Sequence, residues 1–151
     1  MKKILVAFYS HSGKTKKAAE QIHAIVGGDI FEIKEKDPYP RSYNVVVDQA
    51  KREIAKGFKP ALEGDLPDIR TYDIIFAGSP NWWSTIAPPL STFLSSADFT
   101  GKIIIPFITH GGGGLGRTVT DIKKLVQGAK VLDGFDANNA DRISTWVKAL
   151  V

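Results

Sequence analysis

Apolar and polar positions follow two alternating patterns along this chain. Short apolar runs occupy residues 4–9, 72–78 and 102–108, and short uninterrupted runs of this kind are typical of strands buried on both faces. Between them, apolar residues recur every three or four positions, which predicts amphipathic helices. The predicted strands are 4–9, 29–34, 72–78, 102–108 and 129–132. The predicted helices include residues 18–25, 43–55, 119–126 and 139–150. A further helix is predicted to begin at 88–89.

Five strand-to-helix alternations predict an α/β fold, a three-layer sandwich with a five-stranded parallel sheet in the order 2-1-3-4-5. We expect one domain over residues 1–151. Ligands of such sheets bind outside the carboxyl ends of the strands, where the chain reverses direction. Segments 10–15, 79–85 and 109–116 all follow central strands, so we expect these three segments to meet at one site.

The segment Ser-His-Ser-Gly-Lys-Thr at 10–15 separates the first strand from the first helix. It places hydroxyls, backbone amides and the positive end of a helix around one point, which favours a phosphate. Gly13 permits close approach or a positive φ angle. The alternative is an ordinary helix start that Ser12 caps.

Two features of the other segments indicate a flat ligand. Trp82 and Trp83 are adjacent, so at least one is expected to present its ring to a planar group; otherwise one of them simply covers the core. The glycines at 111–114 leave bare backbone against which a flat group can lie. A phosphate at one end and an aromatic ring at the other describe a mononucleotide of the flavin type.

Composition and charge narrow the possible functions. The 151 residues include no cysteine, which excludes disulfides, thiolate metal sites and cysteine nucleophiles. No apolar run approaches about 20 residues, so we expect a cytoplasmic protein with no membrane partner. Residues 1–60 hold 12 Lys and Arg against 7 Asp and Glu, but no aromatic residues are interleaved with them, and no nucleic-acid partner is expected.

The three segments together resemble the flavodoxin family, whose members bind FMN. Residues 6–22 match the family's N-terminal signature except that Ala7 is smaller than the usual apolar residue. Residues 78–83 resemble the family's second flavin loop and 109–113 its third, so the likeness covers essentially the whole chain. The resemblance implies a flavodoxin-like fold with FMN as cofactor.

The resemblance also implies roles for particular residues. Those expected to bind FMN are Ser10, His11, Ser12, Gly13, Lys14, Thr15, Ser79, Pro80, Asn81, Trp82, Trp83, Thr109, His110, Gly111 and Gly112. The implied function is electron transfer between redox partner proteins. The alternative is an FMN-dependent NAD(P)H:quinone-type reductase with a small-molecule electron acceptor. A sequence pI near 9.3 departs from the acidic surface typical of the family's electron carriers.

A weaker alternative is a dinucleotide-binding domain. Gly111, Gly113 and Gly116 have the spacing of a dinucleotide fingerprint, and Asp133 follows at about the required distance. Three scattered histidines do not predict a metal centre.

Overall fold

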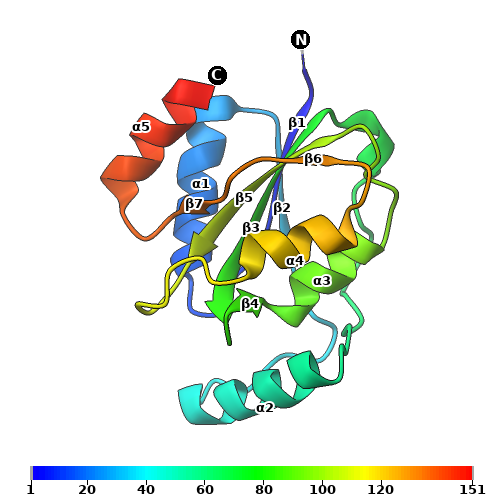
Figure 1. Ribbon diagram of the computed structural model, residues 1–151, viewed down its shortest axis with the longest axis vertical. Coiled ribbons are helices and arrows are strands. Elements are labelled where there is room, and N and C mark those ends of the chain that lie inside the picture. The colour runs from blue at the N-terminus through cyan, green and yellow to red at the C-terminus, as the bar shows by residue number, and fades with distance from the viewer. Residues whose placement is uncertain (1, 151) are drawn as a thin grey trace.

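The protein was analysed as a computed structural model, which describes residues 2–150. A parallel sheet lies at its centre, with its main path in the order β2-β1-β3-β5-β6 (Figure 1). This is the predicted order 2-1-3-4-5, with a short antiparallel strand, β4, added beside β3. The strands are β1 (Ile4–Tyr9), β2 (Asp29–Ile33), β3 (Ile74–Trp82), β4 (Thr85–Ile86), β5 (Ile103–Thr109), β6 (Lys130–Val131) and β7 (Phe135–Asp136).

The predicted strand over 129–132 is present as the short β6, and a further short segment, β7, continues the pairing with β5 beyond the predicted range. Strand β6 pairs with β5 near its start, and β7 pairs with β5 near its end. The carbonyls of Ile104 and Ile108 accept hydrogen bonds from Leu132 and Ala137. Between them stands Pro106, which has no amide hydrogen to donate, and the pairing is interrupted at this point.

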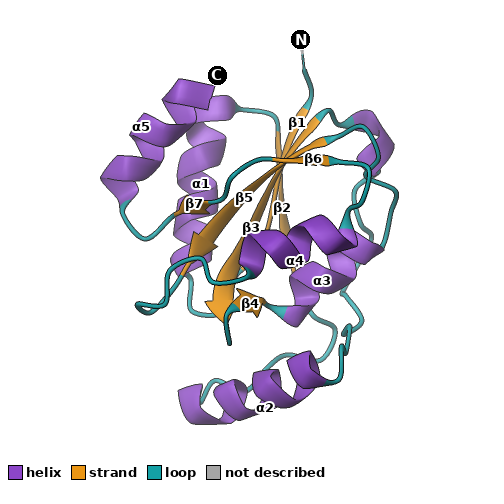
Figure 2. Cartoon of the chain, in the orientation of Figure 1, coloured by secondary structure: helices purple, strands orange, loops and turns teal. Residues whose placement is uncertain are grey.

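Helices cover both faces of the sheet (Figure 2). On one face α1 (Lys14–Val26) packs beside α5 (Ala140–Leu150), and on the other lie α3 (Pro88–Ser95) and α4 (Thr118–Leu125). A single 3₁₀ turn, η1 (Ile69–Thr71), precedes β3. Two apolar clusters result, one on each side of the sheet, which explains the continuous apolar runs of the central strands. Among residues 2–150, none of the helices has the length and apolar character needed to cross a bilayer.

Helix α2 (Tyr43–Ala55) lies on neither face but beyond the carboxyl edge of the sheet (Figure 1). The chain leaves the sheet edge and returns to it through a narrow base. There the Lys36 amide donates to the Ala61 carbonyl at 2.9 Å, and the Glu63 amide donates to the Lys34 carbonyl at 2.8 Å. We call residues 36–61 the α2 flap.

Strand β3 extends further than the sequence predicts. Residues 79–85 were expected to form a loop, but β3 continues to Trp82, turns at Trp83 and Ser84, and returns as β4. The two turn residues have φ angles of 56° and 69°. Tight hairpins require positive φ at both positions to match the strand twist, and they usually place Asn and Gly there. A residue with a side chain costs about 1–2 kcal/mol in this conformation.

Replacing Ser84 by glycine is therefore expected to stabilise the protein. The substitution removes the cost of the left-handed conformation but adds chain entropy to the unfolded state, so the free energy of unfolding should rise by about 0.5–1 kcal/mol. Urea titration measures the change. In the matched control Ser95→Gly, at the end of α3, the free energy of unfolding should fall by a similar amount. A decrease in both variants would contradict the strain at Ser84.

Candidate functional site

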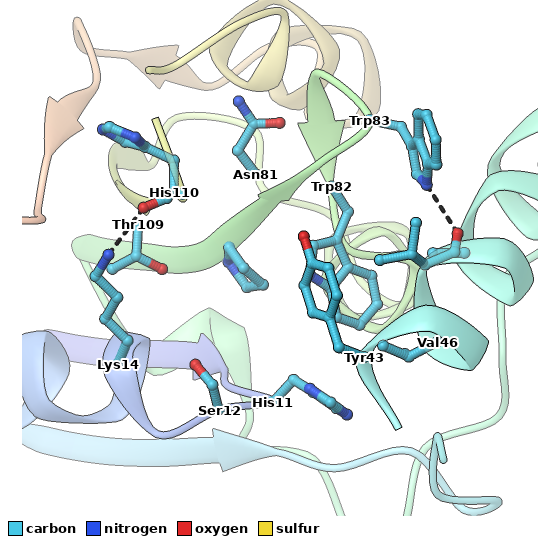
Figure 3. A pocket seen from close by; sticks show the side chains of 14 residues that line it. His11, Ser12, Lys14, Tyr43, Val46, Asn81, Trp82, Trp83, Thr109 and His110 are labelled. Carbon is cyan, nitrogen blue, oxygen red and sulfur yellow. Dashed lines mark hydrogen bonds between the residues drawn. The ribbon is translucent and has the colours of Figure 1, made fainter. Parts of the chain in front are cut away.

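A cavity of about 480 Å³ lies at the carboxyl edge of the sheet (Figure 3). All three predicted segments contribute to it, and the α2 flap closes its outer side. Its size suits a small-molecule ligand. The lining residues are His11, Ser12, Lys14, Tyr43, Val46, Val47, Ala50, Pro80, Asn81, Trp82, Trp83, Thr109, His110 and Gly111.

The first loop leaves helix amides free at the start of α1. Gly13 is the N-cap residue, with a φ of 94°, so the alternative of a Ser12 cap is wrong. Ser10 instead accepts hydrogen bonds from the amides of Gly13 and Lys16. Among residues 2–150, no hydrogen bond uses the amides of Lys14 or Thr15. Unpaired amides at the positive end of a helix favour an anion.

Two contacts join this loop to the third loop. The Lys14 ammonium donates to the His110 carbonyl at 2.8 Å. The buried hydroxyls of Thr15 and Thr109 share a hydrogen bond of 2.7 Å. The start of α1 is therefore held against the end of β5.

The two tryptophans both line the cavity but have different surroundings. Trp82 is partly buried and packs edge-on against Tyr9 and Tyr39, with ring centroids 5.8 Å and 5.3 Å away, and against His11. Trp83 is 45% exposed, and its indole Nε1–H donates to the Val47 carbonyl of α2. Trp82 thus covers the core and also lines the cavity.

The second and third segments are also tied together. The Asn81 amide group donates to the Gly114 carbonyl at 2.8 Å, and the Arg117 amide donates to the Ser84 carbonyl. Gly116 has a φ of 53°, and a Cβ there would lie 2.8 Å from the Ser84 carbonyl oxygen. Only glycine lets the third loop approach the hairpin this closely.

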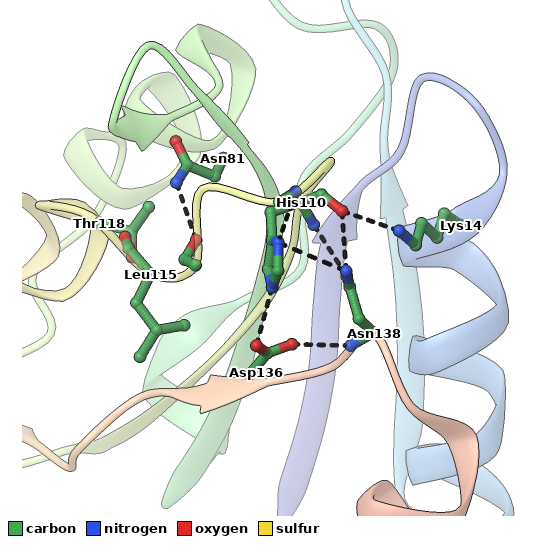
Figure 4. Close-up of polar contacts among 9 residues, drawn as sticks. Lys14, Asn81, His110, Leu115, Thr118, Asp136 and Asn138 are labelled. Atoms are coloured by element: carbon green, nitrogen blue, oxygen red, sulfur yellow. Dashed lines mark hydrogen bonds and ion pairs between the residues drawn. The ribbon is translucent and has the colours of Figure 1, made fainter.

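His110 is the centre of a polar network (Figure 4). Its Nδ1 accepts a hydrogen bond from the Gly112 amide at 2.9 Å, and its Nε2 lies 2.7 Å from an Asp136 carboxylate oxygen. Because Nδ1 accepts, the hydrogen must sit on Nε2 and be donated to Asp136. Asn138 hydrogen-bonds both the amide and the carbonyl of His110. The network fixes the orientation of the His110 ring and the start of the segment 109–116.

Asp136 is held in its charged form. Burial raises the pKa of its carboxyl group, but the hydrogen bonds from His110 and from the Asn138 amide outweigh burial, and the pKa lies below its usual value. No pattern in the sequence indicates a role for Asp136 or Asn138, because both lie beyond the predicted end of the fifth strand.

The residues that line the cavity carry positive charge or none. They include Lys14, His11 and His110, and among residues 2–150 no aspartate or glutamate lines the cavity. With the free amides of α1, this composition favours an anionic ligand.

The structure brings ten of the fifteen predicted residues to the cavity: His11, Ser12, Lys14, Pro80, Asn81, Trp82, Trp83, Thr109, His110 and Gly111. The others lie close by without lining it. Ser10 and Gly13 shape the first loop, Thr15 pairs with Thr109, Ser79 is buried and accepts from the Ala87 amide, and Gly112 binds His110.

The cavity also has a wall that the sequence did not predict. It consists of Tyr43, Val46, Val47 and Ala50 of α2. The helical pattern at 43–55 was visible, but nothing in it indicated that α2 lies at the sheet edge. Asp133, which the dinucleotide alternative requires, is exposed and is not among the lining residues.

We expect Asp136→Asn to lower the free energy of unfolding only at pH values at which Asp136 is charged. The folded pKa lies below the unfolded value of about 3.9, so the stabilisation is complete above about pH 5 and is lost as the pH falls through the folded pKa. Because the carboxylate is half exposed, the loss at pH 7 should be about 1 kcal/mol.

Urea midpoints measured from pH 3 to pH 7 test this expectation for Asp136→Asn. Asp65→Asn, at an exposed position outside the network, is the control and should change little. A deficit in Asp136→Asn that stays constant down to pH 3 would contradict the charged hydrogen bond.

The chain is similar to known flavoproteins over its whole length. The family model described as flavodoxin matches residues 3–150. A candidate flavoprotein from Bacteroides eggerthii is 32% identical, with a TM-score of 0.87 and 99% of this chain and 98% of that chain covered. A flavoprotein from Lactobacillus acidophilus in complex with FMN is 28% identical, with a TM-score of 0.77 and 95% and 99% covered.

More distant structures share the fold. A Fusobacterium nucleatum flavodoxin bound to flavin mononucleotide is 14% identical, with a TM-score of 0.61 and 99% of this chain and 97% of that chain covered. No curated protein matches the chain. The match of the family model to nearly all residues decides the assignment, and the chain belongs to the flavodoxin family.

Proposed function

We propose that this protein binds FMN in the cavity and acts in electron transfer. The observation that carries the proposal is the convergence of two features on one cavity: free amides at the start of α1, and a wall of indole and apolar side chains. The first suits a phosphate and the second a flat aromatic ring. The FMN complex of the Lactobacillus acidophilus relative supports the same cofactor.

The residues present fit FMN in charge and shape. Ser12 and Lys14, which line the cavity, would hold the phosphate together with the unpaired amides of Lys14 and Thr15 at the start of α1. Residues 80–83 and the α2 wall would enclose the ring, and residues 109–112 would border it. When bound, FMN supplies the uptake and release of one or two electrons. The protein excludes water and fixes the ring.

The second candidate function is an FMN-dependent NAD(P)H:quinone-type reductase. It is favoured by the α2 wall, since an enclosed apolar pocket suits a small electron acceptor better than a docked protein. Steady-state NAD(P)H oxidation with a quinone separates the two candidates. A reductase turns over with these two small molecules, whereas an electron carrier needs a protein partner.

Removing the charge of Lys14 is expected to weaken FMN binding chiefly through the phosphate, and it also removes the contact to the His110 carbonyl. Losing one charge-assisted hydrogen bond costs about 1.5–3 kcal/mol, so the dissociation constant for FMN should rise at least about tenfold in Lys14→Met. Quenching of flavin fluorescence measures it. Riboflavin has no phosphate, so its binding should change little in the same variant.

Lys17→Met is the matched control for Lys14→Met, since Lys17 is an exposed residue of α1 that does not line the cavity. It should bind FMN as the unaltered protein does. If Lys14→Met weakened riboflavin and FMN equally, Lys14 would not contact the phosphate. If the unaltered protein failed to bind FMN, the proposed function would be wrong.

A further inference from the structure

Trp83 connects the β3–β4 hairpin to the α2 flap. Its Nε1–H donates to the Val47 carbonyl at 2.9 Å, a contact drawn in Figure 3. The ammonium of Lys51, one helical turn further along α2, lies 5.1 Å from the centre of the indole ring. Both contacts reach from a strand of the sheet to a helix that lies outside it.

The chain holds this indole in an unfavourable backbone conformation. Trp83 has a φ of 56°, and its large side chain is 45% exposed. Burial of this side chain therefore offsets little of the free-energy cost of the left-handed conformation. An Asn-Gly turn would close the same hairpin without strain. Strain that persists in a cavity-lining turn indicates a role beyond closing the hairpin. The contacts to Val47 and Lys51 are what Trp83 gains and an Asn-Gly turn would lack.

The α2 flap depends on few attachments. In α2 itself Val46 and Ala50 are the buried residues, and Tyr39, at the start of the flap, is also buried and packs on Tyr9 and Trp82. At the base, two backbone hydrogen bonds close the flap, and the Pro60 carbonyl accepts from the Thr92 hydroxyl. Near its start, the Pro40 carbonyl contacts the His11 ring. A helix of 13 residues is marginal by itself in water, so its contacts with the hairpin matter for its order.

We propose that Trp83 is a positioning residue that holds α2 across the FMN site, so that the α2 wall controls how long FMN stays bound. This inference rests on the proposed function. The wall residues Tyr43, Val46, Val47 and Ala50 lie on the outer side of the cavity. A ligand enclosed by them leaves only after α2 moves away, and release of the Trp83 contact permits that movement.

Trp83→Phe tests the proposal, because phenylalanine keeps an aromatic ring and loses the indole N–H. Hydrogen exchange of the α2 amides should become about three- to tenfold faster in the cofactor-free protein, as expected for one lost hydrogen bond. FMN should dissociate faster by a similar factor, measured by the recovery of flavin fluorescence on dilution. Lys51→Met should shift both rates in the same direction by a smaller factor.

Trp146→Phe is the matched control. Trp146 packs on Phe135 and Phe76 on the face of the sheet that α1 and α5 cover, and it does not line the cavity, so this variant should leave α2 exchange and FMN dissociation unchanged.

The outcomes separate the two proposals. Faster FMN dissociation with unchanged α2 exchange would mean that Trp83 acts by direct contact with FMN, and the inference would be overturned. If neither α2 exchange nor FMN dissociation became faster in Trp83→Phe, the inference would be overturned as well. If the unaltered protein did not bind FMN, the proposed function would fail, while α2 exchange would still decide whether Trp83 positions the helix.

Discussion

Burial of the parallel sheet on both faces is the constraint on which the rest of this structure depends. Helices α1 and α5 cover one face and α3 and α4 the other, and central residues such as Val6 and Ile75 are completely buried. Neither face can therefore hold a polar ligand. Helix starts and free amides gather at the carboxyl edge, which is where the cavity lies. The position of the site follows from how the core is covered.

The loops at this edge are held by one another as well as by the sheet. Thr15 pairs with Thr109, Lys14 with the His110 carbonyl, and Asn81 with Gly114. Because these bonds fix the loops relative to one another, little conformational entropy has to be lost when a ligand binds. The α2 flap is the exception, since it is attached at its base, through Tyr39 and at Trp83.

Local patterns in the sequence were sufficient for most of the fold and for the location of the site. Apolar runs marked the central strands, and the order of the sheet followed from strand–helix alternation. Three features depended on contacts distant in sequence and were missed: the further short strand β7, the extension of β3 through Pro80 and Asn81, and the α2 wall. Proline and asparagine are common in turns, so the sequence predicts that this strand ends at residue 78.

The narrow base of the α2 flap has an evolutionary consequence. Residues 36–61 enter and leave through backbone hydrogen bonds that use no particular side chain, between Lys36 and Ala61 and between Lys34 and Glu63. The whole segment can thus be exchanged as a cassette, while the loop at 10–15 stays intact on the other side of the cavity. Related chains could diversify the molecules that reach the cofactor by replacing this one cassette, with the cofactor itself unchanged.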